Sequence, residues 1–101
     1  MLINEIAKMC NLTKKAVEYY TEQKLICPHI LENGYRDFSK RDVEVLKQVA
    51  LYRRLGLSIS EIKIIFDNPE QLKSILYKKT LELEQEKAKQ EILQKLCNGE
   101  N

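Results

Sequence analysis

The chain has 101 residues, enough for one domain, and its hydrophobic content of 44% is too high for a disordered polypeptide. Charged residues make up 32%, which suits solvated helices, and three glycines and two prolines are too few for a sandwich of many short strands. The net charge is only +2, but residues 1–56 carry ten Lys and Arg against seven Asp and Glu. A nucleic-acid surface would need such an excess, and an ordinary solvated face would explain it equally well.

Two short helices are predicted at the start of the chain. Ile3, Ile6 and Ala7 recur at helical spacing, and Asn11 stands where the first helix would end, since Asn tolerates the left-handed backbone of such a turn. Thr13 is the predicted N-cap of a second helix over residues 14–23. Two short helices joined by a tight turn form a helix-turn-helix candidate, although the same arrangement occurs in proteins that never touch DNA.

A two-stranded hairpin is predicted next. Pro28 prevents the helix from continuing. Asn33 and Gly34 stand between two short runs that contain apolar residues, and this dipeptide is a strong hairpin signal because both residues accept positive φ. A hairpin directly after a helix-turn-helix corresponds to a wing.

Three further helices follow the hairpin. Ser39 is the predicted cap of a third helix, which Gly56 ends, and a capping box at residues 58–61 begins a short fourth helix. Asn68 is the expected cap of a long helix that runs without Gly or Pro over residues 70–96, about 40 Å in length. The predicted fold class is therefore mainly all-α, with a small β-hairpin.

The long helix is expected to have a partner, because an isolated helix in water is marginal without tertiary burial. A heptad seam from residue 72 to residue 97 is satisfied at five of its eight positions. These five are the predicted dimerisation residues Leu72, Leu76, Leu83, Leu93 and Cys97. A second, broken apolar set lies beside them at Ile75, Leu81, Ala88, Ile92 and Leu96. We favour two copies pairing along this helix over a solvated single helix or one packed on a domain further along the chain.

Three segments together resemble the MerR family of bacterial winged helix-turn-helix transcription regulators. They are Ile3 to Lys8 with Asn11-Leu12-Thr13, then Tyr19-Tyr20 with Leu25-Ile26, Pro28 and Asn33 to Arg36, and finally Leu55 to Ile62. The resemblance implies a winged helix-turn-helix head over residues 1–68, a dimerisation helix over residues 69–97 that forms an antiparallel coiled coil, and a polar tail over residues 98–101.

The resemblance also implies a function. Such a homodimer binds a palindromic promoter site in double-stranded DNA and bends or distorts the promoter, with RNA polymerase as a further partner, in the bacterial cytoplasm on the nucleoid. No effector domain follows the long helix, so the chain is either a minimal regulator or a fragment of a longer one. The alternative is a protein-interaction module that pairs through the long helix and binds DNA weakly or not at all, which Glu18 and the small net charge motivate.

The residues expected to contact DNA come from the second helix, the wing and the end of the third helix. The start of the second helix would enter the major groove, where exposed amides and lysines attract phosphate. The resemblance implies a basic contact at Lys15 and phosphate contacts at Tyr20 and Arg36. The predicted DNA-binding residues are Thr13, Lys14, Lys15, Tyr19, Tyr20, Tyr35, Arg36 and Arg54. Three residues depart from the family pattern, since Glu18 stands where Arg is usual, and Lys24 and Asn11 each stand where Gly is usual.

Catalytic, metal and cofactor sites are not expected, and neither is enzymatic activity. His29 is the sole histidine and has no nucleophile arranged beside it, and the sequence holds no Gly-rich phosphate loop and no H-E-x-x-H motif. Cys10, Cys27 and Cys97 form no C-x-x-C pair, and no apolar run reaches the length of a membrane span, so reduced thiols in the cytoplasm are expected. A redox or metal sensor through Cys97 is a third, weaker hypothesis, because one thiolate is not a site.

Overall fold

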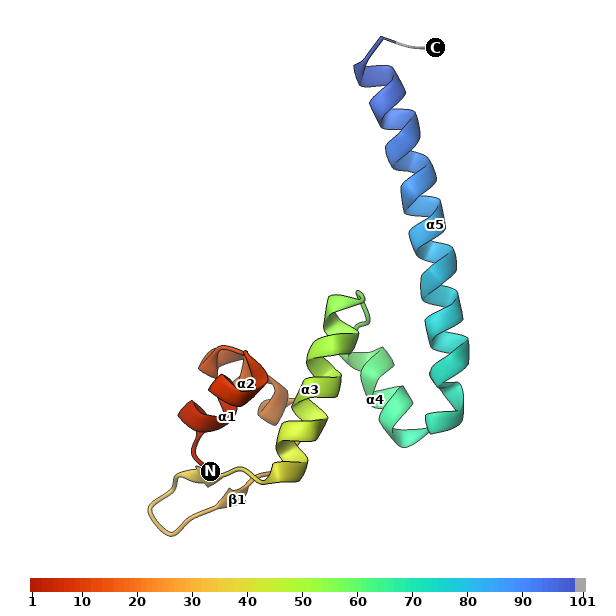
Figure 1. Ribbon diagram of the computed structural model, residues 1–101. Coiled ribbons are helices and arrows are strands. Elements are labelled where there is room, and N and C mark those ends of the chain that lie inside the picture. The colour runs from red at the N-terminus through yellow and green to blue at the C-terminus, as the bar shows by residue number, and fades with distance from the viewer. Residues whose placement is uncertain (100–101) are drawn as a thin grey trace. The chain divides into compact units, whose positions relative to one another are not determined.

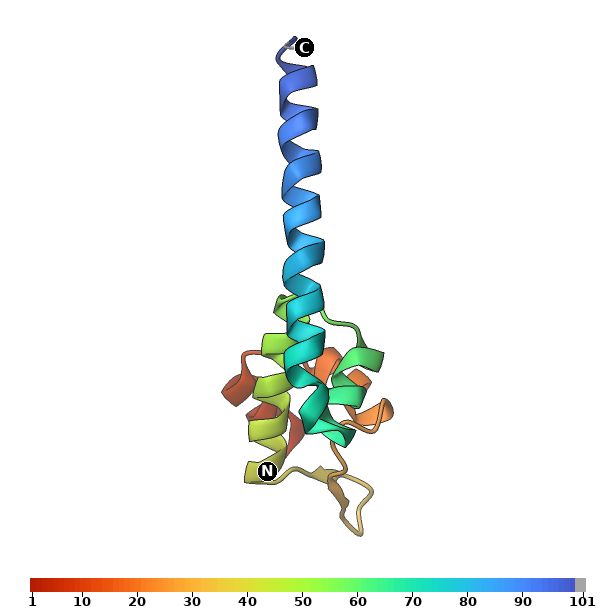
Figure 2. The same ribbon diagram turned by 90° about the vertical axis from the view of Figure 1, so that its right-hand side faces the viewer.

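The computed structural model describes residues 1–99, and it is mainly helical with one small hairpin, which confirms the predicted fold class (Figures 1 and 2). In chain order the elements are α1 (Ile3–Cys10), α2 (Lys14–Glu22), β1 (His29–Ile30), β2 (Arg36–Asp37), α3 (Lys40–Arg54), α4 (Ile59–Asp67), the 3-10 turn η1 (Pro69–Gln71) and α5 (Leu72–Cys97). The chain divides into two compact units, the first over Met1–Lys63 and the second from Ile64 onward. The last two residues of the predicted polar tail lie outside the described residues.

The turn between α1 and α2 forms as the sequence predicts. α1 ends at Asn11, whose φ of 54° is left-handed, and the amide of Leu12 then donates to the Ala7 carbonyl at 2.9 Å. The Thr13 hydroxyl accepts from the amide of Ala16 at 3.0 Å and so caps α2. After α2 the chain turns through Lys24, which also has a left-handed φ, of 62°. A backbone conformation that favours glycine is therefore occupied by a lysine.

Reciprocal capping boxes begin both α3 and α4, which confirms the Ser39 cap and the capping box at residues 58–61. The Ser39 hydroxyl accepts from the amide of Asp42 at 3.1 Å, and the Asp42 carboxylate accepts from the amide of Ser39 at 2.9 Å. Ser58 and Glu61 repeat this pair of bonds at 3.1 and 2.9 Å. Asn68 occupies the predicted N-cap position before Pro69, but its side chain makes no cap bond to η1. Its side-chain Nδ2 instead donates to the Ile64 carbonyl at 3.5 Å.

The core of the first unit is apolar and is built around α1, which packs against both α2 and α3 (Figure 1). Its largest fully buried side chains are Phe38, Ile6, Leu46, Leu57, Ile62, Val17 and Val49. The inner face of α3 carries Val43, Leu46 and Val49, at steps of three residues. Leu51 and Leu55, further along the chain, are 52% and 44% exposed. This leaves an open apolar surface at the end of α3.

The wing is a minimal hairpin whose turn lies where the Asn-Gly signal predicts. β1 and β2 pair antiparallel, with Ile30 opposite Arg36. Gly34 has a φ of 86° and donates to the Leu31 carbonyl at 2.9 Å, while the Asn33 side chain accepts from the amide of Tyr35 at 3.1 Å. The turn is therefore closed by its own backbone and by one Asn side chain.

The first residue of the chain is bonded to the segment that leaves the wing. The Met1 ammonium lies 2.6 Å from the Asp37 carboxylate and donates to the Phe38 carbonyl at 2.8 Å. The Phe38 amide donates back to the Met1 carbonyl at 2.7 Å. These bonds join residues that are 36 and 37 positions apart in sequence. They hold the base of the wing against the start of α1, a contact that was not predicted from the sequence.

The second unit is dominated by α5, a 26-residue helix without interruption. Leu72, Ile75 and Leu76 are half-buried, whereas nearly every side chain from Leu81 onward is exposed. Lys79 pairs with Glu82 at 2.8 Å within the helix. No helix among the described residues is both long enough and apolar enough to cross a membrane.

Candidate nucleic-acid interface

The start of α2 presents cationic side chains that have no partner within residues 1–99. Thr13, Lys14 and Lys15 are all exposed, and the Thr13 hydroxyl is used by the cap. Neither lysine makes a hydrogen bond or an ion pair among the described residues, and the first turn of α2 holds no acidic residue. The partial positive charge of the helix start and the two ammonium groups therefore act together on an approaching anion.

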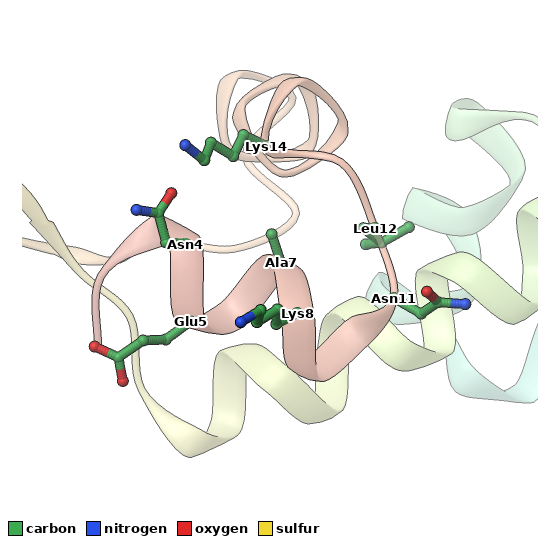
Figure 3. A pocket seen from close by; sticks show the side chains of 7 residues that line it. All are labelled: Asn4, Glu5, Ala7, Lys8, Asn11, Leu12 and Lys14. Carbon is green, nitrogen blue, oxygen red and sulfur yellow. The ribbon is translucent and has the colours of Figure 1, made fainter.

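A hollow beside this helix start brings in residues that the sequence analysis did not select. It is lined by Asn4, Glu5, Ala7, Lys8, Asn11, Leu12 and Lys14 (Figure 3). Figure 3 shows Asn4 and Lys8 on α1 and Lys14 at the start of α2, with their polar ends free. Asn4 and Lys8 are four residues apart and so share one face of α1. That outward polar pair, beside the inward Ile6, is the sequence signal that could have identified them.

The paired tyrosines divide into a buried and an exposed ring. Tyr20 is 8% exposed and Tyr19 is 45% exposed, with ring centroids 5.6 Å apart. Tyr20, the tyrosine expected to contact a phosphate, is therefore the one that packs in the core. Tyr20 still lines a second hollow, to which Lys47 and Arg54 also contribute. Tyr19 presents the open ring.

The wing places its two predicted residues on the surface next to an acidic one. Tyr35 is 63% exposed and Arg36 is also exposed. Both line a hollow between the wing and the helices, to which Glu18 of α2 and Asn4 of α1 contribute. Glu18 and Arg36 make no ion pair within the described residues, so the Arg36 guanidinium is free to meet a phosphate.

The two arginines at the end of α3 have different roles. Arg53 donates to the Leu57 carbonyl at 3.0 Å and so fixes the turn into α4, where Gly56 has a φ of 90°. Arg54 is exposed and makes no such bond. Of this pair, Arg54 is the one available to a ligand, as the sequence analysis chose.

The pKa values of Cys10 and Asp37 are perturbed, and neither group forms a catalytic site. Burial raises the pKa of the Cys10 thiol, although the charge of Lys47 acts in the opposite direction. The hydrogen bond from the Met1 ammonium, and then its charge, lower the pKa of Asp37. Within residues 1–99 no three His, Cys, Asp or Glu side chains are grouped to hold a metal ion.

The structure thus brings most of the predicted DNA-binding residues into the first unit as two adjoining groups. The start of α2 forms one group and the wing forms the other, and Asn4 lines the hollows of both. Arg54 lies apart from them, on the hollow that Tyr20 lines. In the second unit, the predicted dimerisation residues divide: Leu72 and Leu76 are half-buried, while Leu83, Leu93 and Cys97 are exposed.

Comparison with known proteins identifies the family. The family model described as MerR HTH family regulatory protein matches residues 1–69. The chain belongs to the MerR family. It is 32% identical over 93 residues to the HTH-type transcriptional regulator CueR of Yersinia pestis, a match that covers 84% of this chain and 67% of that protein. The chain spans 30% and 46% of the length of two other curated relatives that it matches.

Solved MerR-family structures share the fold. A MerR-family transcriptional regulator from Bacillus cereus is 31% identical, with a TM-score of 0.76 that covers 97% of this chain and 75% of that one. HiNmlR, a MerR family regulator lacking the sensor domain and bound to promoter DNA, matches with a TM-score of 0.66 at 16% identity, covering 92% of this chain and 76% of that chain. The second likeness concerns the fold alone.

Glu18 and Lys24 are two of the residues that the resemblance identifies as departures from the family pattern. Glu18, at the usual Arg position, lines the hollow beside Arg36, where a carboxylate opposes phosphate. Lys24, at the usual Gly position, takes the left-handed backbone that Gly would take without strain. The fold accommodates both departures.

Proposed function

We propose that two copies of this MerR-family chain bind a palindromic promoter site, with the start of each α2 in a major groove and each wing on the adjacent backbone. One observation carries the proposal: exposed cations without partners among the described residues, Lys14, Lys15 and Arg36, lie on two adjoining surfaces of one packed unit. Phosphate contacts of this kind fix register and orientation on DNA.

The dimer would regulate transcription by changing the shape of the promoter. Two recognition helices held about one turn of DNA apart would bend the duplex between them, at an elastic cost of order 1–6 kcal/mol. RNA polymerase would then meet promoter elements in a changed alignment, in the bacterial cytoplasm. HiNmlR, which shares the fold, lacks the sensor domain and is bound to promoter DNA, which supports DNA binding by a chain without such a domain.

A protein-interaction module without DNA binding is the less favoured function. Its support is Glu18, which brings a negative charge next to the wing. Against it stand the identity of the relatives as transcriptional regulators and the free cations of α2. Binding to random-sequence and promoter duplexes at low salt separates the two proposals.

The double variant Lys15→Ala/Arg36→Ala tests the proposed docking. A hydrogen bond to a charged group contributes about 1.5–3 kcal/mol, so we expect affinity for the chain's own promoter fragment to fall by about 100-fold or more. The dimer would lose four phosphate contacts, which should reduce the slope of log affinity against log salt by about 3 to 4. Fluorescence anisotropy between about 50 and 200 mM salt measures both quantities.

The matched control is Lys73→Ala/Lys87→Ala, which removes the same charge from α5. Both control lysines are exposed and make no ion pair among the described residues. The control should bind with nearly unchanged slope. A Lys15→Ala/Arg36→Ala protein that binds with the affinity and salt slope of the control would refute the docking arrangement.

A further inference from the structure

Glu18 lies on the outer face of α2. The buried residues of this helix are Val17 and Tyr20. Successive helical residues are about 100° apart, so the direction opposite to these two is shared, within about 50°, by Lys15, Glu18 and Glu22. All three side chains are exposed. If the start of α2 enters a major groove, as proposed above, Glu18 is therefore on the face that meets the DNA.

The Glu18 carboxylate has no partner within the part of the chain that the structure describes. Lys14 and Lys15 stand four and three residues before it, a spacing that permits ion pairs on a helix, and Arg36 lines the same hollow. Glu18 nevertheless makes no hydrogen bond or ion pair with any of them. It therefore makes no polar contact that holds the helix or the wing, and both of its oxygens can accept from an external donor.

A carboxylate in a closed protein–DNA interface lowers the affinity unless it meets a donor. Phosphates repel it, and its loss of water costs free energy without a compensating hydrogen bond. In the major groove guanine and thymine present acceptors, and adenine presents its N7 acceptor beside the N6 amino group. Cytosine presents the N4 amino group alone. Cytosine is therefore the base that satisfies a carboxylate best.

We propose that Glu18 is a specificity-determining residue, which accepts a hydrogen bond from the N4 amino group of a cytosine in each half-site. This rests on the docking of α2 proposed above and names the base that the docking selects. Lys14, Lys15 and Arg36 would contact phosphates, which fix the position of the protein on DNA but do not distinguish sequences. Glu18 supplies the discrimination between bases that these cations cannot.

Glu22 provides a matched comparison on the same face of α2. It carries the same charge and is also exposed, but it is the last residue of the helix and does not line the hollow beside Arg36. At 1.5 Å per residue Glu18 lies about 6 Å along the axis from Lys14, and Glu22 about 12 Å. Base edges are contacted by the N-terminal part of a recognition helix, so Glu18 is the better placed of the two.

The substitution Glu18→Gln tests the proposal because it keeps the size of the side chain and changes its hydrogen-bonding pattern. A glutamine amide both donates and accepts, which matches the N7 and N6 atoms of adenine. Selection from a library of random-sequence duplexes, followed by sequencing, gives the base preference of each protein. The unaltered chain should select a C·G pair at one position of each half-site, and Glu18→Gln should select an A·T pair at that position.

The size of the switch can be measured with two selected duplexes that differ only at this pair in both half-sites. A wrong base pair reduces affinity by about 5-fold or more, and the two half-sites act together, so the unaltered chain should prefer the C·G duplex by about 25-fold or more. Glu18→Gln should reverse the order in fluorescence anisotropy. Glu22→Gln should keep the original preference to within about 3-fold. Circular dichroism should show the same helix content for all three proteins, because both glutamates are exposed.

Three results would overturn the proposal. The first is a Glu18→Gln protein that selects the same bases as the unaltered chain at every position. The second is an equal gain of affinity for both duplexes, which would mean that Glu18 only repels phosphate. The third is a switch of base preference by Glu22→Gln and not by Glu18→Gln.

Failure of the proposed function gives a different result. An unaltered chain that binds none of the duplexes at low salt would refute the proposed function and the role of Glu18 with it. Binding that prefers certain sequences and depends on Lys15 and Arg36, but shows no change of base preference in Glu18→Gln, would refute the role of Glu18 alone.

Discussion

Lys24 holds a strained backbone conformation immediately after α2. Its φ of 62° lies in the left-handed region, which costs an L-residue other than Gly about 1–2 kcal/mol. Its side chain is exposed and makes no hydrogen bond or ion pair among the described residues, so removing it loses no contact. The added freedom of Gly in the unfolded chain costs about 0.5–1 kcal/mol. Lys24→Gly should therefore raise the free energy of unfolding by about 0.5–1 kcal/mol.

Thermal unfolding measures this change. For a chain of this size each kcal/mol shifts Tm by about 4–8 °C, so Lys24→Gly should raise Tm by roughly 2–8 °C. Protein concentration must be the same for all variants, because association shifts Tm by mass action. Lys24→Ala is the control, since it removes the lysine and keeps the Cβ that causes the strain. Equal rises in Tm for the Ala and Gly variants would refute the strain argument.

Two other changes test the first unit. Leu46→Ala should lower the free energy of unfolding by about 2–5 kcal/mol in urea denaturation, because Leu46 is fully buried in α3, and a loss below about 1 kcal/mol would contradict the packing described. The Met1 ammonium lowers the folded-state pKa of Asp37, so their pair stabilises the fold above the unfolded carboxyl pKa, and this contribution is lost as pH falls through the lowered folded pKa. Asp37→Asn should be less stable at neutral pH and less sensitive to acid, and identical acid unfolding curves for the two proteins would show that the pair contributes nothing.

Local signals in the sequence were sufficient for most of the fold. The Thr13 cap, the Ser39 capping box and the Asn33-Gly34 turn each depend on residues within three or four positions, and all three form as predicted. The same holds for Gly56 at the end of α3. Where the partners of a hydrogen bond are close in sequence, residue type and spacing determine the geometry.

Contacts between residues that are distant in sequence could not be predicted from residue type and local spacing. The bond from Met1 to Asp37 joins residues 36 positions apart, and no periodicity marks it. Tertiary packing also decides which of Tyr19 and Tyr20 is buried, because adjacent helical residues point in different directions and either ring could pack in a core. The family resemblance implies that Tyr20 is the phosphate contact, whereas most of the Tyr20 side chain is buried in the core.

The heptad seam predicted in α5 depends on a second copy of the chain, so it stays a prediction. Its first members, Leu72 and Leu76, are half-buried, whereas Leu83 and Leu93 are open. Heptad spacing identifies apolar residues that share a helix face, but it does not supply the burial of each side chain.

The bond between Met1 and the base of the wing has a practical consequence. An affinity tag fused ahead of Met1 would convert its ammonium into a neutral amide with a single N–H, which cannot both pair with the Asp37 carboxylate as a cation and donate to the Phe38 carbonyl. Protein purified in that form would carry a loosened wing into every binding measurement. Fusions at the opposite end of the chain leave this contact intact.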